Sequence, residues 1–210
     1  MAKIRSAEDL VDVVQADAGW RKKEMSQLML ILERNKAPDG LGLRAIPVLF
    51  YAHWEGFVRA AGEAYLQFVA KQGIAGNQIA AHLVAYQIEC LVETESPMQR
   101  CASWLSLAET LRSAKPLSVR WRHGIDTKSN LNSTVLSRVV VLLGISPDLF
   151  QAKLQFLDKV LLPRRNAIAH GRRVVPDIRE CREIHDSVIE LVETFANLVM
   201  NAATTGQYKL

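Results

Sequence analysis

The residues best suited to chemistry lie together in the segment 162–173, which reads LPRRNAIAHGRR. Asn166 and His170 are four residues apart, so a helix would place them on one face. The long side chain of Arg165 can reach around to join them. A histidine exchanges protons near neutral pH, and an arginine offers a fixed positive fork to phosphate oxygens. The segment therefore predicts acid–base chemistry on a phosphate-containing substrate.

Three more arginines, Arg164, Arg172 and Arg173, surround this group and make the segment strongly cationic. An alternative is that His170 and Arg173 only favour the C-terminus of a helix, where the dipole attracts cations. An Arg-x4-His pattern is short, so its spacing alone does not decide between the two interpretations.

Other polar residues occur on a predicted helix over residues 43–72. Glu55 and Arg59 are four residues apart on it, as in an ordinary helix salt bridge. The alternative is that they support the site from behind. His53 is in register with two phenylalanines, which favours a satisfied core histidine over a catalytic one.

The stretch 114–130 is the longest expected loop, and it carries Arg120, Trp121 and Arg122. Interleaved basic and aromatic residues suit single-stranded RNA, because bases stack on rings and phosphates pair with cations. The alternative is that Trp121 anchors the loop to the rest of the protein.

The remaining histidines and the cysteines predict no further site. The three cysteines are odd in number and widely spaced, so neither a disulfide framework nor a zinc site is indicated. The chain also lacks a carboxylate cluster suited to a metal. We expect no metal and no cofactor. The residues interpreted as structural or surface positions are His82, His185, Cys90, Cys101 and Cys181.

The elements that must position these residues are helices, since strand signals are nearly absent and capping signals are frequent. The segment 36–42 is predicted as a turn. The helix over residues 43–72 is apolar nearly all round and should be central to a bundle. Helices are expected over 6–35, 43–72, 78–92, 97–113, from Asn130 or Asn132 to Gly144, over 146–162, 163–171 and from 177 to about 203.

A length of 210 residues, 49% apolar and 23% charged, predicts one soluble all-α domain over residues 1–203. Residues 1–40 would contain the N-terminal helix, and 204–210 a frayed tail. No apolar run reaches the roughly 18 residues that a membrane helix needs. The N-terminus lacks the apolar core of a signal peptide. We expect a cytoplasmic protein with no membrane partner.

The formal net charge of +4 is unevenly distributed. Residues 1–110 carry 11 basic and 13 acidic side chains, whereas residues 111–210 carry 15 basic and 9 acidic ones. The second half is therefore where a polyanion would bind, unless the surplus arginines only form a solvated surface.

Three segments in the same order resemble the HEPN superfamily. RNAIAHG resembles its Arg-x4–6-His signature. Residues Ile46–Val69, which contain YAHWEGFV, are similar to the hallmark helix of one prokaryotic branch, and Ile125–Asn132 (IDTKSNLN) is similar to a further segment of it. The resemblance spans roughly Arg44–Met200.

This resemblance implies a compact α-helical bundle and, as in many members, a metal-independent RNase of toxin–antitoxin, phage-defence or RNA-targeting CRISPR systems. Arg165 and His170 match the family's catalytic pair, and Asn166 its following polar residue. Some HEPN toxins carry a tyrosine two residues after the histidine that a partner antitoxin modifies. Arg172 stands there in this chain, so silencing by tyrosine nucleotidylation is not expected.

The expected function is therefore an endoribonuclease in which the 2′-OH of RNA attacks the adjacent phosphate. One histidine cannot easily act as base and acid at once, so we expect a homodimer. An antitoxin or other regulator is an expected partner. The alternative is a non-catalytic HEPN module that binds RNA or nucleotides or acts as a scaffold. A helical regulator of duplex DNA would need a helix-turn-helix signal, which is lacking.

Overall fold

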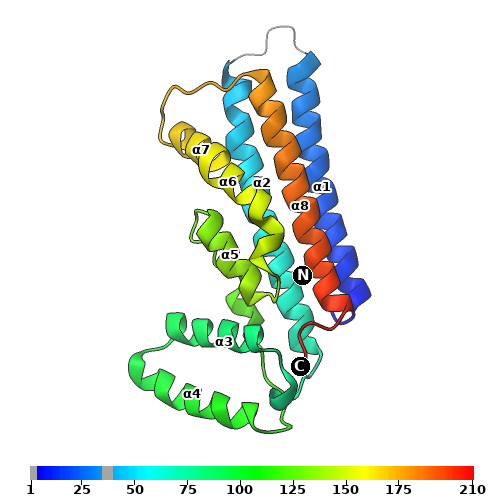
Figure 1. The fold of residues 1–210 in the computed structure, drawn as a ribbon, viewed down its shortest axis with the longest axis vertical. Coiled ribbons are helices and arrows are strands. Elements are labelled where there is room, and N and C mark those ends of the chain that lie inside the picture. The colour runs from blue at the N-terminus through cyan, green and yellow to red at the C-terminus, as the bar shows by residue number, and fades with distance from the viewer. Residues whose placement is uncertain (1–3, 35–39) are drawn as a thin grey trace.

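Three long helices lie side by side along the molecule: α1 (Ala7–Arg34), α2 (Gly40–Lys71) and α8 (Ile178–Thr204) (Figure 1). The computed structural model describes residues 4–34 and 40–210. A capping box starts α1, because the Asp9 N–H donates to Ser6 Oγ over 3.0 Å and the Ser6 N–H donates back to Asp9 Oδ2.

Helix α2 is the centre of the bundle, as its apolar composition predicts. It contacts α1, α7 and α8, and its large side chains Phe50, Trp54 and Phe57 are fully buried. It begins at Gly40, so the turn expected over 36–42 is wrong for residues 40–42. Residues 36–39 of that turn lie outside the described part of the chain.

Helices α3 (Ala81–Thr94) and α4 (Pro97–Leu111) form a hairpin at the end of the molecule opposite α7 (Figure 1). A capping box starts α4, in which Ser96 and Gln99 bond each other's backbone N–H groups. Short 3-10 turns lie at Gly76–Gln78 (η1) and, within the long loop, at Trp121–His123 (η2).

Helix α5 (Ser133–Leu142) is capped by Asn132 rather than Asn130, because the Val135 N–H donates to Asn132 Oδ1 over 2.8 Å. The helix expected over 146–162 is divided into a 3-10 turn, η3 (Pro147–Phe150), helix α6 (Gln151–Phe156) and a wide π-helical turn, η4 (Leu157–Leu161). The turn η4 continues without a break into α7 (Leu162–Ala169).

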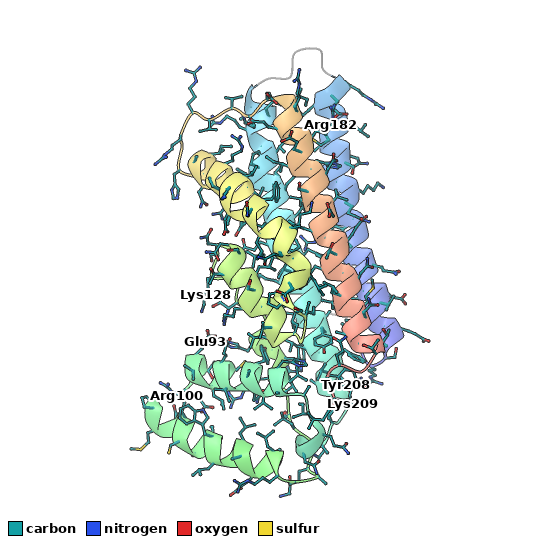
Figure 2. All side chains as sticks on the ribbon, in the orientation of Figure 1. Glu93, Arg100, Lys128, Arg182, Tyr208 and Lys209 are labelled. Carbon is teal, nitrogen blue, oxygen red and sulfur yellow. The ribbon has the colours of Figure 1, made fainter. Side chains whose placement is uncertain are left out.

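The C-terminal tail is not frayed, and the expectation for residues 204–210 is wrong. Tyr208 is only 7% exposed and meets Phe68 edge-on, with ring centroids 5.4 Å apart. The Tyr208 carbonyl accepts the Ala80 N–H over 3.1 Å, and the Leu210 N–H donates to the Gln78 carbonyl over 2.9 Å. Figure 2 shows Tyr208 and Lys209 at the lower end of the bundle. This packing is long-range, so local composition does not reveal it.

The fold class is all-α, as expected. Within residues 4–34 and 40–210, the extended pairings are two isolated bridges, Ala75 with Pro116 and Ile79 with Lys209. The buried apolar side chains of the helices join in one cluster, which is the core of a single domain. Among the described helices, none combines the length and the apolar character that crossing a bilayer requires.

The ordered tail predicts a stability effect. Tyr208→Ala should lower the free energy of unfolding by about 3 kcal/mol, because it empties a packed site, and the melting temperature by roughly 6–12 °C. The control is Leu210→Ala, since Leu210 is 86% exposed and its truncation should leave the melting temperature unchanged. Equal melting temperatures for both variants and the wild type would show that the tail does not pack in solution.

Candidate active site

The segment 162–173 forms α7 and the chain that follows it. Pro163 lies in the first turn of α7, directly after the wide turn Leu157–Leu161. In a regular α-helix the proline ring would clash with the carbonyl of Lys159. The wide turn accommodates Pro163 within one continuous helical segment, and such turns occur frequently at functional sites.

The end of α7 sets the position of His170. Gly171 has φ +77°, and its N–H donates to the Ile168 carbonyl over 3.0 Å. The Arg172 N–H donates to the Ala167 carbonyl over 2.9 Å. These two bonds form a Schellman motif, which needs a residue in the left-handed region. His170 is thus the exposed C-cap residue of α7, held at a defined end of the helix.

Arg165 is half-buried and points across to α2. Its guanidinium carbon lies 4.5 Å from the ring centroid of Tyr51, a cation–π contact. Its Nη1 also donates to Asn166 Oδ1 over 2.7 Å. The structure therefore brings Arg165 and Asn166 into direct contact and shows that Asn166 holds the guanidinium from one side.

Tyr51 is a residue of this site that the sequence analysis missed. It is 1% exposed, and its hydroxyl accepts the Leu131 N–H over 2.7 Å. Burial, together with the negative charge of Glu55, raises the pKa of Tyr51 to about 12. The phenol is therefore protonated at neutral pH. A hydroxyl within the apolar face of the 43–72 helix, four residues before Glu55, was the signal that could have identified it.

Glu55 supports this arrangement through a different partner from the one its spacing suggests. It accepts the Thr127 hydroxyl over 2.6 Å, and Thr127 is buried. No ion pair joins Glu55 to Arg59 in the described structure. Arg59 instead lines an open cavity of about 390 Å³ together with His123. The segment 125–132 is thus joined to α2 at both Tyr51 and Glu55.

The three remaining arginines of the segment differ in their partners. Arg164 forms an ion pair with Glu180 in the first turn of α8, so it ties α7 to that helix. Arg172 and Arg173 are exposed in the chain between α7 and α8. That chain is fastened to α2, because Arg44 donates to the Arg172 carbonyl over 3.1 Å.

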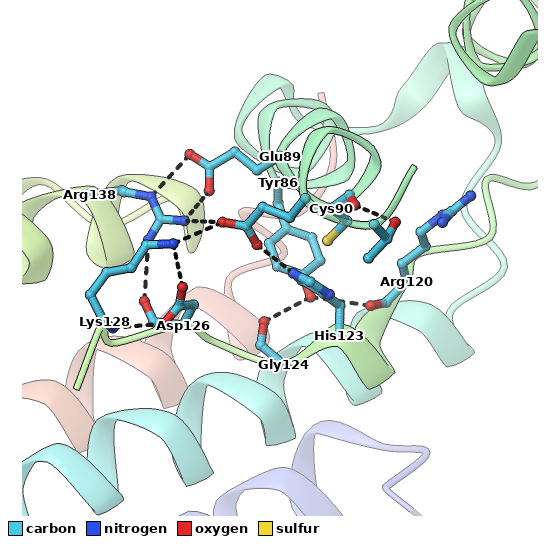
Figure 3. Close-up of polar contacts among 11 residues, drawn as sticks. Tyr86, Glu89, Cys90, Arg120, His123, Gly124, Asp126, Lys128 and Arg138 are labelled. Carbon is cyan, nitrogen blue, oxygen red and sulfur yellow. Dashed lines mark hydrogen bonds and ion pairs between the residues drawn. The ribbon is translucent and has the colours of Figure 1, made fainter. Parts of the chain in front are cut away.

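The cations of the long loop are largely occupied by acids. Arg120 pairs with Glu95 over 2.8 Å. Trp121 is partly buried against the core, with the Arg122 guanidinium 4.9 Å from its ring centroid. These contacts place Trp121 where an anchoring residue would be. Figure 3 shows the loop beside α3. Glu93 of α3 pairs with His123 and Lys128 of the loop.

The other histidines lie outside this site. His53 lies between α1 and α2, edge-on to Trp20 and 3.8 Å from Glu24, and burial lowers its pKa. His82 packs against Gly144, and His185 contacts Ser26 between α1 and α8. Within residues 4–34 and 40–210, no three histidine, cysteine or acidic side chains gather as a metal site would require.

The family model described as RiboL-PSP-HEPN matches residues 16–201. The chain belongs to this HEPN family. The match covers the helical bundle from within α1 to within α8, and it agrees with the HEPN resemblance of the sequence. No curated protein and no solved structure matches the chain significantly.

Membership of the HEPN family suggests RNase-type function and an RNA substrate. The geometry adds that the three segments resembling HEPN proteins meet in this chain: Tyr51 and Glu55 from α2, Thr127 and Leu131 from the loop, and Arg165 from α7. This meeting point is the candidate active site of the HEPN domain.

The helix end beside His170 predicts an effect on stability. Gly171→Ala should lower the free energy of unfolding by about 1 kcal/mol, because alanine is strained at a positive φ. The control is Gly19→Ala inside α1, where no atom approaches the new methyl group and φ is helical. That change should raise the free energy of unfolding by roughly 0.5–1 kcal/mol. Thermal unfolding measures both, and a stabilising Gly171→Ala would contradict the Schellman geometry.

Proposed function

We propose that this HEPN domain is a metal-independent endoribonuclease that acts as a toxin or a phage-defence effector. The observation that carries the proposal is the arrangement on α7, where Arg165 is held between Asn166 and Tyr51 and His170 is exposed at the helix end. The group combines a fixed positive charge with an accessible acid–base side chain.

The chemistry suits RNA because RNA carries its own nucleophile. The 2′-OH can attack the adjacent phosphorus once His170 accepts its proton, and the P–O5′ bond then breaks as the 5′-oxygen gains a proton. Arg165 would stabilise the negative charge that develops on the non-bridging oxygens. Asn166 would keep the guanidinium in place, and the exposed Arg172 and Arg173 would bind flanking phosphates.

A second histidine is needed for the leaving group, and a homodimer would supply it. Two exposed apolar side chains could form such an interface: Val175 in the chain after His170, and Leu41 on α2, next to Gly40, which faces Val175. A symmetric pairing through this surface would bring two α7 helices together. We further propose that an antitoxin or another regulatory protein restrains the active dimer.

We expect Arg165→Ala and His170→Ala each to reduce RNA cleavage at least 100-fold, because each removes a group acting in the transition state. Both variants should stay folded, since neither side chain belongs to the buried core. Glu55→Ala should cost less, because Glu55 acts through Thr127. Arg112→Ala, an exposed arginine at the end of α4, is the control. Cleavage at the wild-type rate by either catalytic variant would refute the assignment.

The products should carry a 2′,3′-cyclic phosphate and a 5′-hydroxyl. A single 2′-deoxyribose at the cut site should stop cleavage there, because it removes the nucleophile. EDTA should leave the rate unchanged, and added salt should slow it. End-group analysis of the fragments is the measurement. A 5′-phosphate, or magnesium rescue of an EDTA-treated enzyme, would mean that metal-activated water attacks. RNA binding without any cleavage would favour the non-catalytic alternative.

Light scattering should give twice the chain mass at micromolar concentration. Val175→Glu should shift the protein toward the monomer and lower activity, because it buries a charge at the proposed interface. The control is Leu105→Glu, which is equally drastic but lies on α4 at the far end of the molecule. A fully active monomer would remove the need for two histidines.

A further inference from the structure

We infer that Tyr51 is a positioning residue for Arg165, and that the turn 125–132 acts through Tyr51 to keep the guanidinium in a catalytic orientation. The inference rests on the proposed function for its catalytic consequence. Its structural part, the contact between ring and guanidinium, can be tested separately. A chain of contacts runs from Arg165 through Tyr51 and the turn 125–132 to α3.

The first contact is between the ring and the guanidinium. An arginine side chain has many rotamers, and α7 is only a short helix, so backbone geometry alone leaves the Arg165 guanidinium free to move. Tyr51 provides a flat, buried surface 4.5 Å from the guanidinium carbon, and Asn166 fixes one of its nitrogens. Tyr51 and Asn166 together fix the plane of the Arg165 guanidinium and the direction in which it points.

The second contact holds the ring itself. The Tyr51 hydroxyl accepts the N–H of Leu131, which is fully buried, over 2.7 Å. The hydroxyl is protonated at neutral pH, and burial raises the pKa of Tyr51 to about 12. The ring is therefore fixed at both ends, with α2 at its Cα and the turn 125–132 at its oxygen.

The third set of contacts holds the turn. Lys128 and Ser129 have φ values of 54° and 53°, which non-glycine residues rarely adopt. Such a conformation persists only where the surroundings enforce it. Thr127 donates to Glu55, and Lys128 pairs with Asp126 and with Glu93 of α3.

Figure 3 shows how these groups continue into α3 and α5. Arg138 of α5 pairs with Glu89 and donates to the Asp126 carbonyl over 3.2 Å. His123 contacts the second oxygen of Glu93 over 2.7 Å. Three helices, α2, α3 and α5, thus hold a turn that makes no proposed contact with RNA. The hydrogen bond to Tyr51 connects this turn to the candidate active site.

The test uses three variants of the full chain. Tyr51→Leu removes the ring, and kcat should fall roughly 100-fold with KM within about twofold, because a misplaced charge stabilises the transition state poorly. Tyr51→Phe keeps the ring and loses the hydroxyl with its bond to Leu131 and its interaction with Glu55, so kcat should fall about threefold. Tyr65→Phe is the matched control, because the Tyr65 hydroxyl is buried on the same helix without a hydrogen-bond partner in the described structure. It should match the wild type.

Two further measurements distinguish positioning of Arg165 by Tyr51 from a merely structural role of Tyr51. In an Arg165→Ala background, Tyr51→Leu should cause no additional loss of activity, because it acts through Arg165. In NMR spectra, the Arg165 side-chain resonances should be shifted by the ring current in the wild type and in Tyr51→Phe, and should lose that shift in Tyr51→Leu. Unchanged resonances in Tyr51→Leu, an undiminished kcat, or a full additional loss without Arg165 would each overturn the inference.

Failure of the proposed function and failure of the inference about Tyr51 give different results. If the wild type does not cleave RNA, the proposed function fails, while the NMR comparison still decides whether Tyr51 holds Arg165. If Tyr51→Leu does not fold, Tyr51→Phe against Tyr65→Phe decides. A roughly threefold difference in kcat between those two variants supports the inference, and equal kcat values overturn it.

Discussion

Helix α2 is buried on most sides, and this constraint governs how the rest of the molecule is arranged. Fifteen of its 32 residues are buried, against α1 and α8 on one side and against α7 and the long loop on the other. Polar groups on such a helix are costly unless they find partners inside the protein. Tyr51 and Glu55 find theirs in the segment 125–132. The need to satisfy two polar side chains on an apolar helix therefore brings the distant loop into the candidate active site.

The short helix α7 depends on the same contact. Its ends are set locally, by the wide turn that accommodates Pro163 and by Gly171 at positive φ. Packing on α2, where Arg165 lies over the ring of Tyr51, determines which face of α7 points inward. An arginine over a buried ring keeps its charge outward while its stem is covered. The helix thus presents Asn166 and His170 from a fixed frame, and Arg164 adds a tie to α8.

Local signals in the sequence predict most of the helices, since caps and helix-ending residues act within a few positions. Asp9, Gln99 and Asp177 each make capping contacts with residues no more than four positions away. The features that local reasoning missed depend on distant partners. Tyr208 is ordered because Phe68 and Ala80 meet it, and Tyr51 gains its role from a residue 80 positions away. Likewise, the sequence predicts two separate helices on either side of Pro163, because proline is typical of a helix start. In the structure the π-helical turn Leu157–Leu161 joins α6 to α7 without a break.

Ion pairs decide which part of the basic second half is available to a polyanion. Arg120, Lys128 and Arg138 pair with glutamates of α3 or of the chain directly after it, and Arg164 pairs with Glu180. Each such pair reduces the field that a phosphate would meet nearby. By contrast, the Arg172 and Arg173 side chains have no acidic partner in the described part of the chain, and both follow His170 directly. Positive charge without an acidic partner is therefore present directly beside His170. A sum over residues 111–210 could not reveal this, because it counts the loop arginines and those beside His170 as equals.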